Sequence, residues 1–506
     1  MFDSRVLGIM LTIVIYLVGM IIVGWFYSKR TKNAGDFYLG GRKLGPFVTA
    51  MSAEASDMSG WLLMGLPGVA LAGSIAEASW TAIGLAIGTY VNWLIVARRI
   101  RRYTEVAGNS VTLPEFFHNR YDDKTKILKT VAALVIVVFF IPYTASGFAA
   151  CGKLFNQIFG WDYTWTMVIS AIVIVIYTSL GGFSAASTTD FIQSIIMSIA
   201  LIAVLVFGVS SVGGFDNVIA NAKEWNGYFS LTTTGEIDGA IGSYNSLTIA
   251  STLAWGLGYF GMPHILLRFM AIKDEAKLKL SRRIASVWVV IAMGVAIFIG
   301  IMGYSMVKNG IITDLADSER IIIAISSVIS KYGFIFAMLA GLILAGILAS
   351  TMSTADSQLL AAASSISEDI TKGVFGAKLS DKKTMLIARL TVICISIIAV
   401  FLALNPNSSV FRIVSFAWAG FGAAFGPVVL FALFWKRSNA WGAIAGMVSG
   451  GAMVFIWKFG IAKLGGIFAI YELLPAFIIA CIAIVVVSLI TPPPSKKITE
   501  LFESIK

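Results

Sequence analysis

Four carboxylates lie within or beside long apolar runs of the chain: Glu54, Asp57, Asp190 and Asp356. A fifth, Glu77, lies where such a run begins. A carboxylate in apolar surroundings is destabilising unless it binds an ion or a partner, so these acids are candidate functional groups. Hard cations such as sodium prefer oxygen ligands, and this residue chemistry therefore indicates cation binding. Asp57 is the strongest candidate because its apolar run is interrupted immediately after it.

Hydroxyl residues in the run LAGILASTMSTADSQLL are spaced to share one face of a helix. Ser350, Ser353 and Thr354 stand at positions i, i+3 and i+4. They could complete an oxygen cage with carbonyls of another segment, although the same residues also serve as small packing residues between membrane helices. Asp356 follows about 60° around the same helix and could extend an ion path toward Asp190.

Two apolar runs contain residues that break helices. The first, MSAEASDMSGWLLMGLPGVALAG, carries Ser59 and Gly60 after Asp57, and the second, STLAWGLGYFGMPHILLRF, carries three glycines and Pro263. Unwinding a membrane helix frees carbonyls for a cation and directs helix N-termini at an anionic substrate group. Interrupted spans at matching positions of two halves indicate a transporter site built on inverted repeats. The alternative is that glycine and proline are simply common in membrane helices.

The composition describes the elements that must position these groups. Charged residues make up 13% and hydrophobic residues 58% of 506 residues, which predicts an all-α polytopic membrane protein. The net charge of +11 does not indicate nucleic-acid binding, because the basic residues flank apolar runs. Two histidines and three scattered cysteines offer no zinc spacing, and no GxxxxGK[ST] run indicates ATP hydrolysis. We therefore expect a transporter and not an enzyme.

Thirteen transmembrane helices are predicted. Their expected bounds are 5–27, 46–69, 77–97, 130–157, 162–180, 186–213, 246–270, 285–308, 335–365, 386–404, 411–435, 438–460 and 471–491. Of the 38 Lys and Arg residues, 29, Arg268 among them, fall on one side of these spans and nine on the other. Because cytoplasmic loops retain basic residues, the N-terminus is expected outside and the C-terminus inside.

The two interrupted spans divide this single domain, 1–506, into repeats. Five helices counted from each give a first inverted repeat at 46–213 and a second at 246–435. One extra helix, 5–27, precedes them. Two further helices, 438–491, and a cytoplasmic tail, 492–506, follow.

Six segments of the chain resemble the sodium/solute symporter family, and within it the sodium/proline branch. The segments are LGGRKLGPFVTAMSAEASDMSGWLLMGLPG, FFIPYTASG, YTSLGGFSAASTTDFIQ, WGLGYFGMPHILLRFMA, ASTMSTADSQLL and SFAWAGFGAAFGPVVLF. The resemblance runs from about residue 8 to residue 490. It implies a LeuT-like 5+5 inverted-repeat core and sodium-coupled import of L-proline, by alternating access, across a bacterial cytoplasmic membrane. The alternative is a symporter of the same fold for another small amino acid, an osmolyte or a carboxylate.

The resemblance also implies roles for individual residues. Sodium is expected to bind the carbonyls of Ala55, Met58 and Ser350 and the hydroxyls of Ser353 and Thr354, with Asp57 as the essential carboxylate nearby. The expected proline-binding residues are Ser59, Gly60, Trp61, Tyr143, Trp255, Tyr259 and Pro263, and Arg42 matches an arginine at the inner mouth. The chemistry is suitable because proline is a compact zwitterion: free amides suit its carboxylate, and aromatic faces suit its ring and cationic nitrogen.

Three positions depart from the family pattern. Glu54 and Ser350 stand where a small residue is usual, and Asp356 stands where a small polar residue is usual. Extra carboxylates change the charge around a cation, so our hypothesis is that Glu54 or Asp356 tunes ion selectivity. A sensor role would need a cytoplasmic domain after the last helix, and only about 15 residues follow it.

Overall fold

The computed structural model describes the chain except residues 1–2, 30–33, 236–240, 314 and 506. Within the described residues, ten helices are long and apolar enough to cross a membrane. In hydrocarbon every backbone N–H and C=O must be paired internally, which a helix achieves. They lie in α1 (Ser4–Ser28), α5 (Ile75–Val91) continuing through η3 (Asn92–Val96) into α6 (Ala97–Val106), α8 (Ile127–Phe159), α9 (Tyr163–Val212), α13 (Leu278–Lys308), α15 (Phe334–Ser364) with η8 (Ser365–Val374), α16 (Asp381–Leu402), α17 (Val410–Phe434), α18 (Ala440–Phe459) and α19 (Leu473–Ile490).

Two further stretches are split into shorter helices. The first comprises α3 (Pro46–Asp57), η2 (Trp61–Gly65) and α4 (Leu66–Ala72), and the second comprises α11 (Ser246–Leu253), η4 (Ala254–Phe260) and α12 (Pro263–Ala271). These are the two runs that the sequence predicts to be interrupted.

The long helix α9 bends at Gly182, which has φ 64° and ψ −175°. A positive φ is strained for any residue with a Cβ atom, so glycine allows the bend. The bend separates an apolar helix at Tyr163–Ser179 from a second one at Gly182–Val212. The two spans expected at 162–180 and 186–213 correspond to these two parts.

Short elements connect the long helices. They are α2 (Ala34–Leu39), η1 (Gly40–Arg42), α7 (Leu113–Tyr121), α10 (Phe215–Lys223), η5 (Glu275–Lys277), η6 (Ser318–Arg320), α14 (Ile321–Ile329), η7 (Ser330–Tyr332), η9 (Ile461–Leu464), η10 (Gly466–Phe468) and α20 (Lys496–Glu503). The antiparallel hairpin β1 (Thr233–Gly235) and β2 (Ile241–Ser243) is the small β element, with Thr234 opposite Gly242. The stretch 214–245, expected as a loop, thus carries α10 and this hairpin.

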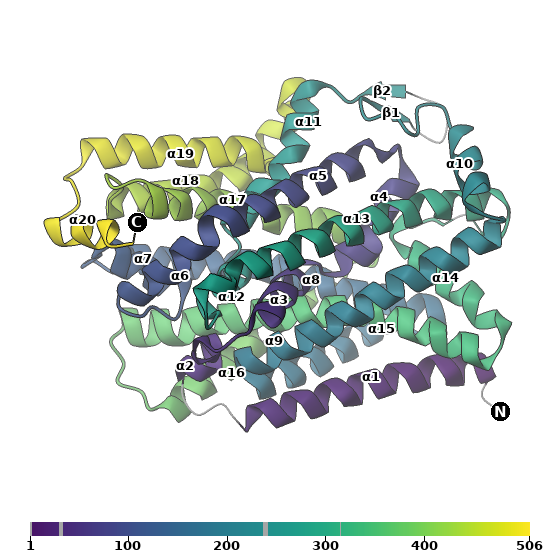
Figure 1. Cartoon of the computed structure of the whole chain (residues 1–506), viewed down its shortest axis with the longest axis horizontal. Helices are drawn as coiled ribbons and strands as arrows, with labels where there is room; N and C mark the ends of the chain where they lie inside the picture. Colours follow the sequence, from purple (N-terminus) through teal and green to yellow (C-terminus); the bar gives the residue numbers. More distant parts are fainter. Residues whose placement is uncertain (1–2, 30–33, 236–240, 314, 506) are drawn as a thin grey trace.

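Helix α15 runs through the core and is buried along most of its length. It packs against α9, α8 and α1, while α18 and α19 pack against each other and α17. Figure 1 shows α1 at one edge of the helix bundle and α19 at the opposite edge. These two helices lie outside the expected repeats. The two chain ends lie at opposite ends of the bundle.

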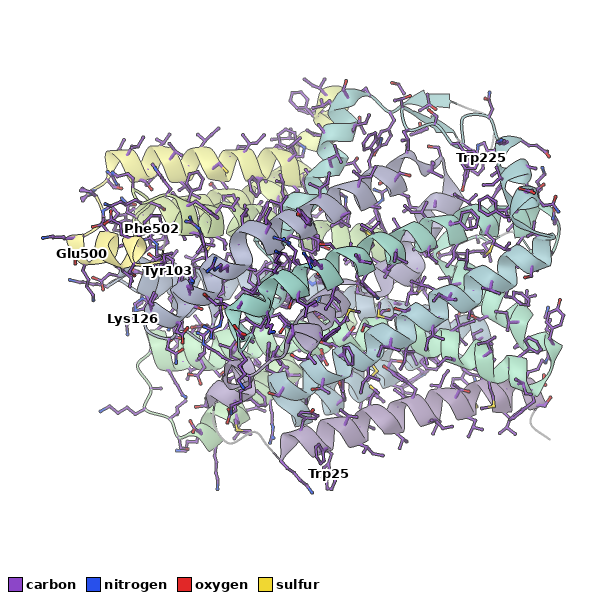
Figure 2. The ribbon with its side chains drawn as sticks, in the orientation of Figure 1. Trp25, Tyr103, Lys126, Trp225, Glu500 and Phe502 are labelled. Carbon is purple, nitrogen blue, oxygen red and sulfur yellow. The ribbon has the colours of Figure 1, made fainter. Side chains whose placement is uncertain are left out.

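The C-terminal helix α20 folds back onto the end of the bundle beside α6 and α7 (Figure 1). The Ser495 hydroxyl accepts a hydrogen bond from the Ile498 amide and caps the helix. Phe502 is buried, with its ring centroid 6.4 Å from that of Tyr103, and Figure 2 shows the two side chains together. The Arg120 guanidinium lies 5.2 Å from the Phe502 ring centroid, a cation–π contact.

Replacing Phe502 by alanine is expected to release the tail. Loss of a buried phenylalanine ring destabilises its contact by about 3 kcal/mol, so we expect trypsin to cut after Lys497 at least roughly tenfold faster. Mass spectrometry of the purified protein during limited digestion measures the rate. Glu500→Ala, on the exposed face of α20, is the matched control, and an unchanged rate in Phe502→Ala would contradict the docking contact.

Candidate functional site

The first broken helix ends in the acidic segment. Helix α3 stops at Asp57, and Met58 follows with φ −78° and ψ 68°, outside the helical region. The chain resumes helical structure at Trp61, so the break covers Met58 to Gly60. The break lies where the sequence predicts it, and its backbone is partly free of helical hydrogen bonds.

The second broken helix unwinds through the 3₁₀ segment η4 and restarts at Pro263, the first residue of α12. Proline is suited to that position because it has no N–H to leave unpaired. Gly258 permits a close approach: a Cβ atom there would lie 1.9 Å from the Trp418 indole nitrogen. That nitrogen donates to the Trp255 carbonyl at 2.7 Å, and α17 therefore holds the unwound segment.

Asp57 connects the two broken helices. The Tyr259 hydroxyl donates to Asp57 Oδ2 at 2.6 Å. The Asp57 carbonyl accepts from the Trp61 indole at 3.1 Å and from the Tyr143 hydroxyl at 3.2 Å. Asp57 Oδ1 is buried and has no hydrogen-bond partner among the described residues. Three of the predicted substrate residues thus contact Asp57, one through its carboxylate and two through its backbone carbonyl.

The hydroxyl face of α15 meets the first break. Ser353 Oγ donates to the Ala55 carbonyl at 2.8 Å, and Thr354 Oγ1 donates to the Ser350 carbonyl at 3.0 Å. All four residues are buried, as is Met58 at the start of the break. The structure therefore brings α3 and α15 together through oxygen atoms that hard cations prefer.

Replacing Ser353 by alanine is expected to weaken sodium binding by roughly tenfold, because the change removes one oxygen near the Ala55 carbonyl, an interaction of about 1.4 kcal/mol. The measurement is the sodium concentration that gives half-maximal uptake of labelled proline by proteoliposomes. Ser364→Ala is the matched control, since Ser364 lies on the same helix and donates only to the Ala361 carbonyl. Equal half-saturation in both variants would contradict a role for Ser353.

Aromatic rings cluster between the two breaks. The Trp61 and Trp255 ring centroids are 6.3 Å apart, and Tyr471 stacks on Trp255 at 5.2 Å. Tyr259 packs edge-on against Trp418 at 5.1 Å. Trp255 also lines a cavity of about 490 Å³ together with Tyr471. Sequence reasoning did not single out Trp418 or Tyr471; the run SFAWAGFG contains the first of them but gives no sign that its indole reaches the break.

Asp190 belongs to a buried ionic network. Its Oδ2 accepts from Ser52 Oγ at 2.7 Å and from Arg268 Nη2 at 3.0 Å. Arg268 also donates to Ser52 Oγ at 3.0 Å, to Ser357 Oγ at 2.5 Å and to the His264 carbonyl at 2.9 Å. Arg268 therefore joins α12 to α3, α9 and α15.

The sequence assigned Arg268 to the basic residues that flank spans, and this assignment is wrong. Arg268 is 1% exposed and is the ionic partner of Asp190. Asp356 is linked to this pair through Ser357, whose hydroxyl donates to Asp356 Oδ1 at 3.2 Å and accepts from Arg268. The fixed cation Arg268 therefore lies on the ion path that was hypothesised between Asp190 and Asp356.

The remaining predicted residues lie away from the aromatic cluster. Glu54 Oε1 accepts from the Trp93 indole at 3.0 Å, on the side of α3 that faces η3. Arg42 donates to the Met270 carbonyl at 2.6 Å and to the Ser110 carbonyl at 2.9 Å. Arg42 thus lies where α12 ends, at the end of the bundle that carries α6 and α7 (Figure 1).

The chain is similar to several curated transporters over nearly its whole length. It is 43% identical to the osmoregulated proline transporter OpuE of Bacillus subtilis, over 98% of this chain and 97% of the relative. It is 43% identical to the high-affinity proline transporter PutP of Bacillus subtilis, over 96% and 98%. It is also 43% identical to a sodium/proline symporter of Haemophilus influenzae, over 98% and 97%.

Solved structures share the arrangement of helices. A Na⁺-coupled sialic acid symporter, in a substrate-bound outward-open state, superposes with a TM-score of 0.79 at 19% identity, over 97% of this chain and 99% of that one. MhsT in complex with L-phenylalanine superposes with a TM-score of 0.53 at 14% identity, over 88% of this chain and 98% of that one. At these identities the likeness shows the fold alone, which is that of LeuT-like transporters.

The family model of the sodium:solute symporters matches residues 37–450. That range contains both broken helices, Asp57 and the hydroxyl face of α15. The chain belongs to the sodium:solute symporter family.

Proposed function

We propose that this chain imports L-proline together with sodium across a bacterial cytoplasmic membrane by alternating access. The observation that carries the proposal is the hydrogen bond between Tyr259 and Asp57, which joins the two broken helices. The other carboxylate oxygen of Asp57 has no partner within the part of the chain that the structure describes. The names of the relatives, sodium/proline symporter and proline transporter, support the cargo and the coupling ion.

The proposed sodium site lies between α3 and α15. The carbonyls of Ala55, Met58 and Ser350 and the hydroxyls of Ser353 and Thr354 would supply its oxygen ligands. Ser353 and Thr354 donate hydrogen bonds to two of these carbonyls, which supports the assignment. The hydroxyl and carbonyl oxygens already lie next to one another, so the hydroxyl groups need only rotate for oxygen lone pairs to face a cation. Asp57 supplies the negative charge nearby.

The proposed proline site lies between the two breaks. The Gly60 amide suits the proline carboxylate, since it stands at the N-terminal end of the helical segment that resumes at Trp61. The Ser59 amide donates to the Asp57 carbonyl at 2.8 Å, so Ser59 would contribute through its hydroxyl. Trp61, Tyr143, Trp255 and Tyr259 offer rings to the pyrrolidine and its cationic nitrogen. Pro263 starts α12 and so fixes where the second break ends.

Coupling follows from the helices that the two sites share. Sodium holds α3 against α15 and thereby fixes the break that also binds proline, so each ligand raises the affinity for the other by the same factor. The broken helices then rock against the remaining repeat helices and open the site inward, with Arg42 at the inner mouth. One sodium ion moving down roughly 150 mV supplies about 3.5 kcal/mol, enough for about 300-fold accumulation of a neutral zwitterion.

The proposed topology has thirteen spans. Ten are the long apolar helices, and the others are the first part of α9 and the two broken stretches. The repeats are 46–213 and 246–435, with the N-terminus outside and the C-terminus inside. An odd number of spans agrees with chain ends at opposite ends of the bundle (Figure 1).

The test is uptake of labelled proline by proteoliposomes under imposed sodium, lithium or proton gradients. Accumulation driven by sodium, and lost when the sodium gradient is collapsed, is the expected result. Competition by unlabelled amino acids, osmolytes and carboxylates distinguishes proline from the alternative cargoes. Equal uptake without any cation gradient would contradict coupled transport.

Glu54 and Asp356 give a further prediction about ion choice. Both are buried acids at positions where the family usually has smaller residues, and each changes the charge near the proposed cation site. Glu54→Gly and Asp356→Ser are expected to change the ratio of sodium-driven to lithium-driven or proton-driven uptake severalfold. An unchanged ratio in both variants would remove this hypothesis.

A further inference from the structure

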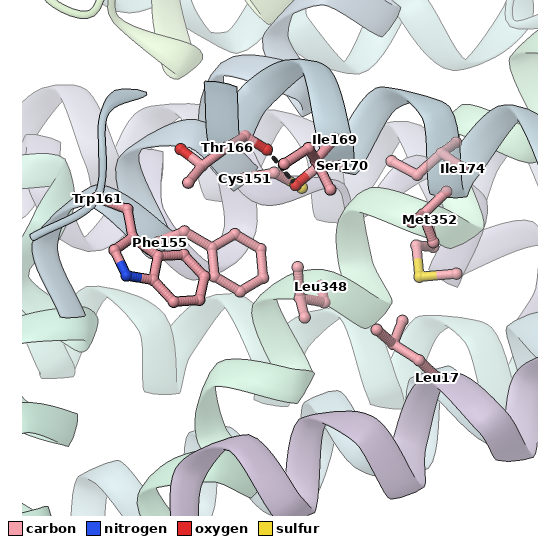
Figure 3. A pocket seen from close by; sticks show the side chains of 11 residues that line it. Leu17, Cys151, Phe155, Trp161, Thr166, Ile169, Ser170, Ile174, Leu348 and Met352 are labelled. Atoms are coloured by element: carbon pink, nitrogen blue, oxygen red, sulfur yellow. Dashed lines mark hydrogen bonds between the residues drawn. The ribbon is translucent and has the colours of Figure 1, made fainter. Parts of the chain in front are cut away.

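A cavity of about 140 Å³ lies between α1, α8, α9 and α15, away from the two broken helices. Figure 3 shows the side chains that line it, with Leu17 on one side and the α9 residues on the other. Its apolar wall comes from four helices: Leu17, Phe155, Ile174, Leu348 and Met352, together with the Cys151 thiol. No role proposed above uses this cavity.

The two hydroxyl groups in the wall have partners within the protein. Ser170 Oγ donates to the Thr166 carbonyl at 2.7 Å, drawn as a dashed line in Figure 3. Thr166 Oγ1 donates to the Asp162 carbonyl at 2.9 Å. A buried water needs two to four polar partners, and cavities of about 150 Å³ with apolar walls stay dry and take up apolar molecules. The chemistry of the wall therefore favours an apolar occupant.

The cavity is continuous with the surface that faces lipid. Ile169, in its wall, is 58% exposed, and Trp161 at its end is 48% exposed. Trp161 stacks with Phe159 at 4.7 Å, and such aromatic groups mark the interface between headgroups and hydrocarbon. From that interface the wall extends along α9 to Ile174, in the direction that a lipid chain takes.

We propose that this cavity binds a segment of an acyl chain of a membrane lipid. The chain enters beside Ile169 and ends against Leu348 and Met352. Because Met352 directly precedes Ser353, the bound chain contacts the helix of the proposed sodium site. The binding site itself does not depend on the proposed function, and its test measures no transport.

The experiment uses the full-length protein in phosphatidylcholine vesicles that contain a phosphatidylcholine with a photoactivatable diazirine near one acyl end. After irradiation, mass spectrometry maps the adducts. Cys151 and Met352 are 1% and 3% exposed, so adducts at these residues require a chain inside the cavity. Adducts on Ile482 and Val486, which lie on the exposed face of α19, provide the reference for ordinary lipid contact.

The variant Leu348→Trp fills the cavity from α15, and Ser170→Leu fills it from α9. We expect adducts at Cys151 and Met352 in the native protein and at least a fivefold loss of them in each variant, with the reference adducts unchanged. Leu386→Trp, on the exposed face of α16, is the matched control and should leave all adducts unchanged. The absence of adducts at both residues in the native protein, or their persistence in both variants that fill the cavity, would overturn the proposal.

Discussion

Replacing Asp57 by asparagine is expected to abolish sodium-driven accumulation of proline. The substitution keeps the shape of the side chain and an acceptor for the Tyr259 hydroxyl, but it removes the negative charge beside the proposed cation site. A charge at about 4 Å, at an effective dielectric constant near 20, contributes about 4 kcal/mol, so sodium affinity should fall by at least roughly a hundredfold. The measurement is the sodium dependence of proline uptake in proteoliposomes.

Two variants separate the charge from the contacts. Tyr259→Phe removes the hydroxyl that donates to Asp57 and leaves the carboxylate, so it should change sodium half-saturation much less than Asp57→Asn does. Asp216→Asn removes an exposed acid of the helix α10, which lies outside the two broken stretches, and should leave uptake unchanged. Sodium dependence in Asp57→Asn that matches the native protein would exclude Asp57 from the cation site.

The long helices and the two breaks could be predicted from sequence because each has a strong local cause. A span needs about 20 apolar residues, and a break needs glycine or proline beside polar residues, as at Ser59, Gly60 and Pro263. The helical spacing of Ser350, Ser353 and Thr354 correctly predicted a shared face. That this face meets the Ala55 carbonyl depends on tertiary packing, which the family resemblance implied and spacing alone did not.

The features that sequence reasoning missed depend on contacts between distant segments. Arg268 stands near the end of an apolar run, where a basic residue ordinarily marks a loop, and its partner Asp190 is 78 residues away in the chain. Trp418 is one of 13 tryptophans, and only the absence of a Cβ atom at Gly258 shows why its indole reaches the second break. The docking of α20 likewise depends on Tyr103 and Arg120, far from the tail in sequence.

The buried ion pair connects both broken helices to α9 and α15. Arg268 on α12 pairs with Asp190 on α9 and with hydroxyls on α3 and α15, all of them buried. In the proposed function sodium and proline bind the same helices, so a change in this network should affect stability and coupling together. A large effect on stability is expected because both side chains of the pair are buried, so the loss of one leaves the other charge unpaired in the interior.

Replacing Arg268 by methionine is accordingly expected to destabilise the protein by about 3–5 kcal/mol, since it leaves the Asp190 charge buried without its cation. Because the entropy of unfolding grows with chain length, the melting temperature of the purified protein should fall by roughly 3–5 °C. The double variant Arg268→Met with Asp190→Asn removes both charges and should recover more than half of that loss, because an uncharged amide tolerates burial better than a carboxylate.

Arg412→Met is the matched control: its ion pair with Glu77 is partly exposed, and exposed pairs contribute about 0–1 kcal/mol. Two results would contradict a stabilising pair of Arg268 with the Asp190 charge. One is an equal fall in melting temperature for Arg268→Met and Arg412→Met, and the other is a double variant that is less stable than Arg268→Met.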